Sequence, residues 1–224
     1  MDVLETYSGH TDPGGAAIRR AVDGLTITKL SVGPMDNNAY LLVCTATNEA
    51  LLIDAAAEPD RLADLVGAGD QRPSLRHVVT THQHWDHWQA LGAVAGMFET
   101  RQIAHPLDAG ELPIPTDELV EDGATVRFGD VALEVVHLRG HTPGSIALLF
   151  RGADRPHLFT GDSLFPGGPG KTNSPEEFDS LLTDLERRVF DRLPDDTWVY
   201  PGHGDDTTVG TERPSVPQWR GRGW

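Results

Sequence analysis

The chain has 224 residues, of which 38% are hydrophobic and 23% are charged. This composition is that of a folded protein with a substantial apolar core, so global disorder is excluded. The 34 Asp and Glu residues outnumber the 18 Lys and Arg residues and produce a formal net charge of −16. Nucleic acids and anionic membranes are bound chiefly by cationic side chains, so we expect neither as a partner.

The sequence has no feature typical of membrane insertion or export. Its longest strongly apolar runs, residues 50–57 and 146–150, are far shorter than the roughly 18 residues that a membrane-spanning helix needs. Residues 1–7 are acidic, where a secretion signal is basic. We therefore expect a cytoplasmic protein. The single cysteine, Cys44, lies in an apolar run and is predicted to be a small core residue.

The first part of the chain alternates between strand and helix patterns. Residues 1–24 are polar and glycine-rich and are interpreted as an N-terminal extension. Short aliphatic and β-branched runs then predict strands, and spaced leucines predict a helix. In chain order these elements are strands at 25–30, 39–44 and 51–53, a helix at 60–66, and a strand at 75–80.

The alternation continues to the end of the chain. Ser174 followed by Pro175, with Glu177 three residues after Ser174, is typical of a capped helix start. The predicted elements are a helix at about 87–98, strands at 102–104, 124–127, 131–136, 146–150 and 157–160, a helix from 174 to about 193, and a strand at 197–200. The sequence thus predicts one domain over residues 25–210, with a loosely packed tail at 211–224.

A histidine-rich segment follows the strand at 75–80. It contains His82, His84, Asp86 and His87. Alternate side chains of an extended segment point to the same side, which groups the first three, and a turn into the next helix brings His87 beside them. Imidazole and carboxylate groups are ligands of Zn²⁺ and similar ions. Burying so many polar groups without an ion is costly, so the segment predicts a metal site.

Three further candidate ligands follow later strands. His141, Asp162 and His203 each lie in a turn that also contains glycine. Glycine permits a tight backbone path and a close approach to a site. Two metal ions need more ligands than the histidine-rich segment supplies, and these three side chains are the candidates that complete such a site.

The complete pattern, His-x-His-x-Asp-His followed by a later His, Asp and His, resembles the metallo-β-lactamase superfamily over residues 25–204. The resemblance implies an α+β fold with four layers, an αββα sandwich. It also implies two divalent metal ions, most often zinc, with iron or manganese as alternatives. Carried over by position, the first metal is held by His82, His84 and His141, the second by Asp86, His87 and His203, and Asp162 bridges both.

Within that superfamily the chain is most similar to glyoxalase II, the hydroxyacylglutathione hydrolases. The similar segments are 81–87, which includes Trp85, 36–41 and 160–165. The resemblance implies hydrolysis of a thioester by a hydroxide that bridges the metals, with Asp86 orienting it. Only 21 residues follow His203, so we expect the C-terminal helical domain of glyoxalase II to be missing. Lys171 is the candidate contact to a small-molecule substrate. Trp85 is predicted to be a core residue, with a lid over the site as the alternative.

Other functions remain open from the sequence. A persulfide dioxygenase of the same superfamily uses one iron, here held by His82, His141 and Asp162. Lactonases of the superfamily usually carry a tyrosine where this chain has Phe165, and a metal-stabilised module without turnover is a non-enzymatic alternative. Residues 170–172 resemble the end of a phosphate-binding loop, but Phe165 stands where that motif requires glycine.

Overall fold

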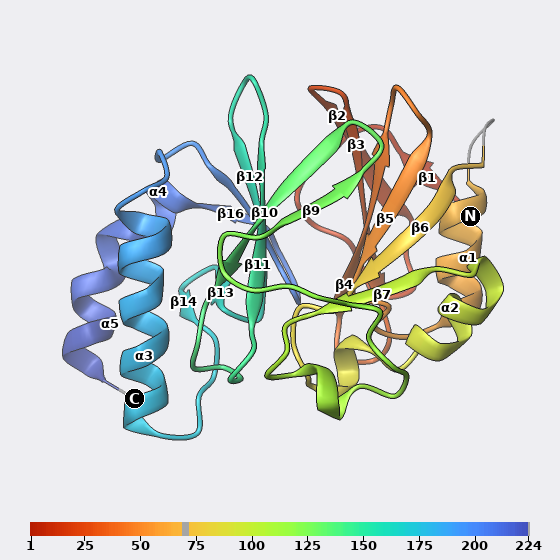
Figure 1. Ribbon diagram of the computed structural model, residues 1–224. Coiled ribbons are helices and arrows are strands. Elements are labelled where there is room, and N and C mark those ends of the chain that lie inside the picture. Colours follow the sequence, from red (N-terminus) through yellow and green to blue (C-terminus); the bar gives the residue numbers. More distant parts are fainter. Residues whose placement is uncertain (69–71, 224) are drawn as a thin grey trace.

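The computed structural model describes residues 1–68 and 72–223. Two β-sheets pack face to face, and helices cover the outer surface of each sheet (Figure 1). This arrangement confirms the αββα sandwich predicted from the sequence. Among the described residues, every helix is too short or too polar to span a bilayer.

The first sheet follows the order of the chain. Its strands β2 to β5 are antiparallel neighbours, whereas β5 to β8 are parallel and need crossover connections. The order across the sheet is β1 (Val3–Leu4), β2 (Ala17–Val22), β3 (Leu25–Val32), β4 (Asn37–Cys44), β5 (Glu49–Ile53), β6 (Ser74–Val79), β7 (Arg101–Ala104) and β8 (Glu118–Leu119).

The second sheet is antiparallel except where β12 and β15 run parallel. A short hairpin, β13 with β14, follows β12. The order across the sheet is β16 (Thr207–Thr208), β15 (Trp198–Pro201), β12 (Pro156–Gly161), β11 (Ile146–Arg151), β10 (Val131–His137) and β9 (Thr125–Phe128), and the hairpin strands are β13 (Leu164–Phe165) and β14 (Gly168–Pro169).

The helices form the two outer layers. α1 (Pro59–Gly67) and α2 (Leu91–Phe98) cover the first sheet, at the right of Figure 1, while α3 (Pro175–Leu185) and α5 (Val216–Arg222) cover the second. The remaining helical segments are short: η1 (Trp85–His87), η2 (Ala109–Glu111), the π-helical turn η3 (Glu186–Phe190), α4 (Val209–Glu212) and η4 (Arg213–Ser215).

The central layers are held by apolar side chains that alternate along the strands. In β4, Tyr40 and Leu42 contribute to the core between the sheets, and Leu41 contributes to the core beneath α1 and α2. Cys44 is also buried between the sheets, as predicted. A strand buried on both faces has a continuous apolar run in its sequence, and this is why pattern analysis predicts these strands well.

Several helix boundaries differ from the prediction. The helix expected at 87–98 is divided into η1 and α2, because the backbone N–H groups of Gln89 and Ala90 donate to the carbonyls of Ala56 and Ala55 instead of continuing one helix. The predicted cap of α3 is confirmed, since Ser174 Oγ accepts from Glu177 N at 3.1 Å. The helical segment after this cap ends at Phe190, in η3.

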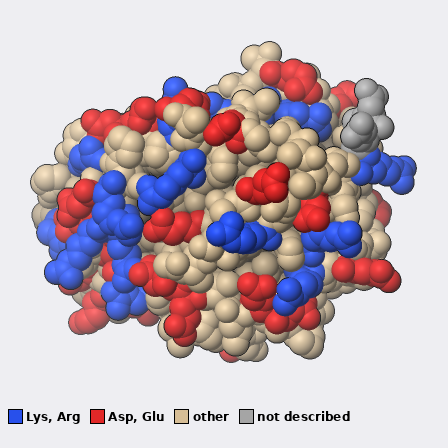
Figure 2. All heavy atoms as spheres, turned by 45° about the horizontal axis from the view of Figure 1, so that its top comes forward, with Lys and Arg blue, Asp and Glu red and all other residues tan. Residues whose placement is uncertain are grey.

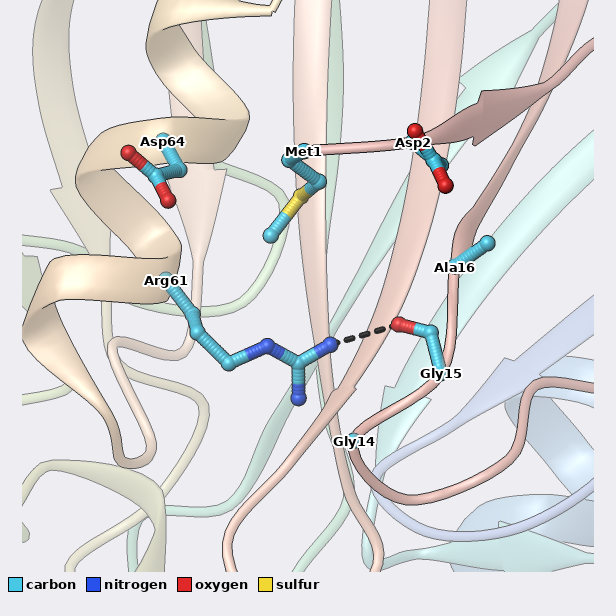
Figure 3. Close-up of a pocket in the computed structure, with 7 residues that line it drawn as sticks. All are labelled: Met1, Asp2, Gly14, Gly15, Ala16, Arg61 and Asp64. Carbon is cyan, nitrogen blue, oxygen red and sulfur yellow. Dashed lines mark hydrogen bonds between the residues drawn. The ribbon is translucent and has the colours of Figure 1, made fainter.

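The predicted extension, residues 1–24, contains β1 and β2. β2 pairs with β3 from Ile18↔Lys29 to Val22↔Leu25, so this part of the extension belongs to the first sheet. Arg61 of α1 donates to the carbonyl of Gly15 at 2.6 Å and holds the segment before β2, as Figure 3 shows. Polar residues such as Arg19 and Arg20 in an edge region hide the strand from pattern analysis.

The predicted loose tail contains α5, which is packed against α3. Trp219 is 3% exposed and belongs to the core beneath these helices, where its ring lies 6.1 Å from that of Phe190. Arg220 pairs with Asp179 and Glu186 on the same layer. Figure 2 shows such neighbouring basic and acidic side chains over much of one face. The tail lacks a helical pattern because Gly and Pro interrupt its short helix.

We expect Trp219→Ala to lower the free energy of unfolding by about 3–5 kcal/mol, because it leaves a cavity beneath α5. Urea denaturation followed by circular dichroism measures this change. Met97→Ala is the control: Met97 is 50% exposed on α2, and its substitution should change stability by less than about 0.5 kcal/mol. Equal stabilities of the two variants would show that the packing of α5 contributes little.

Candidate metal centre

The histidine-rich segment begins just after β6. The chain bends at His82 and Gln83, His84 is extended, and η1 begins at Trp85. Asp86 therefore lies in the turn with His87, rather than in the extended part as the sequence suggested. The turn still brings the carboxylate and the imidazole to the same site, because the backbone of His87 donates to the carbonyl of His84 at 3.0 Å.

The other three predicted residues lie at the ends of strands in the second sheet. His141 lies between β10 and β11, Asp162 directly follows β12, and His203 follows β15. Because β12 and β15 are parallel, their carboxyl ends lie side by side, and Gly202 N donates to the carbonyl of Gly161 at 2.8 Å. The structure brings all seven predicted side chains together.

His82, His84 and His141 form one group, which we call the three-histidine cluster. His84 Nδ1 lies 2.9 Å from His141 Nε2, and His82 Nε2 lies 3.3 Å from the same atom. His82 and His141 are buried, and His84 is partly exposed. Three imidazole nitrogens therefore converge on one point at the edge of the solvent.

Asp86, His87 and His203 form a second group, the mixed cluster. His87 Nε2 lies 3.2 Å from His203 Nε2 and 3.5 Å from Asp86 Oδ2. His203 Nε2 lies 3.3 Å from the same carboxylate oxygen. This cluster offers two nitrogens and one oxygen to a cation.

The carboxylate of Asp162 reaches both clusters. Its Oδ1 lies 3.3 Å from His87 Nε2, and its Oδ2 lies 3.4 Å from His203 Nε2 and 3.6 Å from His141 Nε2. Oδ1 is buried and accepts no hydrogen bond from the described residues. A buried carboxylate oxygen that accepts no hydrogen bond is suited to coordinate a cation between the clusters.

Four of the histidines make a hydrogen bond with the ring nitrogen that points away from the clusters. The contacts are His82 Nδ1 with Thr81 Oγ1 at 3.0 Å, His87 Nδ1 with Asp54 Oδ2 at 2.8 Å, His141 Nδ1 with the carbonyl of Lys171 at 2.7 Å, and His203 Nδ1 with the carbonyl of Met35 at 2.8 Å. Donation from Nδ1 leaves the lone pair of Nε2 directed at the cluster in the neutral ring.

Asp54 is a functional residue that the sequence analysis did not identify. Its side chain is 2% exposed, and its carboxylate accepts from Thr81 N, Thr81 Oγ1 and His87 Nδ1, each at 2.8 Å. Thr81 in turn contacts His82, so one carboxylate orients a histidine of each cluster. Asp54 directly follows β5, and this strand-end position is the signal that could have identified it.

Residues of β3 and β4 hold the mixed cluster from its other side. Asn37 donates to Asp86 Oδ2 at 2.9 Å, and Asn38 donates to the carbonyls of Pro201 and Gly204 at 2.9 Å each. The buried ammonium group of Lys29 also donates to the carbonyl of Gly204, at 2.6 Å. The turn that carries His203 is therefore fixed by β3 and β4 of the opposite sheet.

The protonation equilibria divide the site into two parts. Burial lowers the pKa of His82 and of His141 below the ordinary value, so these rings are neutral. Burial also disfavours protonation of His203, but hydrogen bonds to Asp162 and Asp86 outweigh it and raise its pKa to about 10. In the same way Asp162 and Asp54 raise the pKa of the buried His87. A divalent cation can replace the positive charge of these two imidazolium groups beside the carboxylates.

The structure also places the remaining residues that the sequence singled out. Trp85 is 55% exposed, so the prediction that it is a core residue is wrong. The ring of Phe165 lies 6.3 Å from that of His203. Lys171 contacts His141 through its backbone carbonyl, and its exposed side chain lines a cavity with Phe178 and Arg222. A substrate contact of Lys171 stays a prediction.

Comparison with known proteins gives one matching family model and three informative similar proteins. The family model described as metallo-beta-lactamase superfamily matches residues 32–203. A hydroxyacylglutathione hydrolase of Polaromonas sp. (strain JS666 / ATCC BAA-500) is 35% identical over 168 residues, which cover 75% of this chain and 62% of that protein. ETHE1 from Myxococcus xanthus is 31% identical, with a TM-score of 0.74 and coverage of 86% of this chain and 84% of that chain. TTHA1623, solved in a di-iron-bound form, is 29% identical, with a TM-score of 0.71 and coverage of 85% and 99%.

We expect Asp54→Asn to weaken metal binding by roughly 10–100-fold, because the variant loses the negative charge and one of the acceptor oxygens that orient His82 and His87. Asparagine tolerates the left-handed backbone of this position, where φ is 58°. Competition with a chelator measures the affinity. Asp64→Asn on the exposed face of α1 is the control; affinities equal to wild type in both variants would contradict the orienting role.

Proposed function

Because the chain belongs to the metallo-β-lactamase superfamily, we propose that it is a dinuclear metal-dependent hydrolase of small acyl thioesters. The family match spans all seven candidate ligands and agrees with the resemblance found in the sequence. The observation that carries the proposal is the position of Asp162, whose carboxylate faces both clusters.

The fold family and the two His/Asp clusters support binding of divalent metal ions. In the proposal, the three-histidine cluster holds one ion, the mixed cluster holds the other, and Asp162 contacts both. Nitrogen and oxygen ligands of this kind suit zinc, and they also accept iron or manganese. The di-iron form of TTHA1623 makes iron a serious alternative. Bound ions of this type supply Lewis acidity and lower the pKa of coordinated water.

Asp86 is the residue that we assign to orienting the attacking water. Burial raises its pKa, but hydrogen bonding with His203, the charge of His87 and the amide of Asn37 outweigh burial and hold the pKa below its ordinary value. The group is therefore a carboxylate at neutral pH and can accept a hydrogen bond from water. Its Oδ2 is fixed by Asn37, which limits the directions from which water can approach.

Apolar side chains beside the mixed cluster support an acyl substrate. Met35 is 48% exposed and Trp85 is 55% exposed, although both are large hydrophobic residues. Met35 accepts a hydrogen bond from His203 through its carbonyl, and Trp85 immediately precedes Asp86. With Phe165, they offer apolar surface on which an acyl group can lose contact with water.

The similarity to the hydroxyacylglutathione hydrolase supports a thioester as the scissile bond. This chain spans 62% of the length of that protein. The proposal therefore leaves the thiol carrier unspecified, and a glutathione thioester is one of several thioesters to be tested. The likeness to ETHE1 supports a second candidate, a persulfide dioxygenase with one iron held by His82, His141 and Asp162.

Metal analysis combined with an oxygen-controlled assay separates the two candidates. We expect about two metal ions per chain, and hydrolysis of a thioester panel that includes S-lactoylglutathione at the same rate with and without oxygen. One iron per chain, with oxygen consumption on a persulfide and no anaerobic hydrolysis, would establish the dioxygenase instead.

We expect Asp162→Ala to abolish hydrolysis while the fold is retained, because it removes a carboxylate that contacts both clusters. Thioester hydrolysis is measured together with circular dichroism and thermal unfolding. Asp191→Ala, at an exposed position after η3, is the matched control and should keep full activity. An unchanged rate of thioester hydrolysis in Asp162→Ala would contradict the bridging role of Asp162.

We expect Trp85→Ala to raise KM for thioesters with apolar acyl chains by about tenfold, because it removes apolar contact surface beside the site. Steady-state kinetics on acyl chains of increasing length measure this effect. Leu119→Ala removes an equally exposed apolar side chain on β8 and should leave KM unchanged. A rise in KM that is equal for all chain lengths would contradict the acyl contact.

A further inference from the structure

We propose that Asp108 is a positioning residue, which holds the two turns of the three-histidine cluster at the separation that a metal ion needs. The inference rests on the metal-binding part of the proposed function and does not depend on the identity of the substrate. Asp108 lies between β7 and η2, outside the motif that carries the candidate ligands.

The carboxylate of Asp108 joins the two turns directly. Oδ2 accepts from the backbone N–H of Gln83 at 2.9 Å and from Thr142 Oγ1 at 2.5 Å. Oδ1 accepts from the backbone N–H of Gly144 at 2.7 Å. Gln83 lies between His82 and His84, and Thr142 follows His141. One buried side chain therefore fixes the distance between the segments that supply all three imidazoles.

Asp108 is itself held in place by its own turn. Its backbone N–H donates to the carbonyl of His105 at 3.1 Å, and Ala109 N donates to the same carbonyl at 3.0 Å. The ring of His105 stacks on that of His137 at 4.0 Å, and His137 Nε2 contacts the carbonyl of Pro143 at 2.8 Å. The turn of Asp108 is thus tied to the His141 turn by a second, independent contact.

The energetics favour a positioning role over a purely stabilising one. Asp108 is 1% exposed, and the three described donors to its carboxylate are neutral groups. Burying a carboxylate against neutral donors carries a desolvation cost that an apolar side chain avoids. The carboxylate compensates by accepting from three groups at once with fixed geometry, which an apolar side chain cannot do.

Gly144 provides independent evidence that the contact is close. A Cβ atom at Gly144 would lie 2.7 Å from Asp108 Cγ and Oδ1, and 2.8 Å from Asp108 N. These distances are shorter than van der Waals contact, so any side chain at position 144 must push the His141 turn away from Asp108. Gly144→Ala therefore disturbs the same contact from its other side.

The inference predicts an effect on one cluster only. His87 is anchored by Asp54, and His203 is anchored by the carbonyl of Met35. Neither contact involves Asp108. Loss of the Asp108 carboxylate should therefore lower the metal affinity of the three-histidine cluster and leave the metal affinity of the mixed cluster unchanged.

The test measures Zn²⁺ affinity of the full chain by chelator competition, with thermal unfolding in parallel. In Asp108→Asn the amide group faces hydrogen-bond donors, and we expect a roughly 10–100-fold loss of affinity for one of two metal equivalents. Gly144→Ala should show the same selective loss. In a His203→Ala background, which disables the mixed cluster, Asp108→Asn should lower the affinity for the remaining metal ion. In a His84→Ala background it should have no effect.

Glu212→Gln is the matched control, because Glu212 is also a buried carboxylate that accepts from neutral donors, Gly167 N at 2.9 Å and Thr207 Oγ1 at 2.6 Å. It should lower thermal stability without changing metal affinity. The positioning role is overturned if Asp108→Asn lowers only thermal stability, as Glu212→Gln should, or if it lowers the affinity of both clusters equally. A wild-type protein that binds no divalent metal would overturn the proposed function as well, so the two failures are distinguishable.

Discussion

The organisation of this protein depends on holding imidazole nitrogens 2.9–3.3 Å apart beside carboxylates. These ring nitrogens face one another, and much of the site is buried, so the groups gain little from water. Such an arrangement is unfavourable in isolation and becomes favourable around a cation. The surrounding structure must keep the ligands in place before the cation arrives, and its buried polar contacts serve this purpose.

Three separate anchors share this task. Asp54 orients one histidine in each cluster, Asp108 joins the turns of the three-histidine cluster, and Lys29 fixes the turn that follows β15. Each anchor is almost fully buried and links segments that are distant in the chain. Because each accepts or donates several hydrogen bonds, a small displacement breaks more than one contact, which keeps the ligand geometry within narrow limits.

The sheets determine where these anchors can act. Parallel pairing of β5 with β6, and of β12 with β15, places the residues that follow these strands next to one another. Gly202 is needed at this junction, because a Cβ there would lie 2.1 Å from Asp162 Oδ1. An isolated β-bridge joins Asn37, the first residue of β4, to His203, which follows β15 of the other sheet. The site therefore lies where the edges of the two sheets meet, and both sheets contribute to it.

The sequence by itself determined the central strands, the capped helix α3 and the identity of the seven candidate ligands. The strands, the helix cap and the His-x-His-x-Asp-His motif are local features that act over a few residues, whereas His141, Asp162 and His203 were indicated as a set by the resemblance to the superfamily. The two-residue strands β1, β8, β13, β14 and β16 are too short to carry a pattern. The tertiary structure alone decided that β2 joins the first sheet, that α5 packs on α3, and that Trp85 faces solvent. It also decided which buried groups orient the ligands, because the hydrogen bonds of Asp54, Asp108 and Lys29 join residues with no periodic relation in the chain.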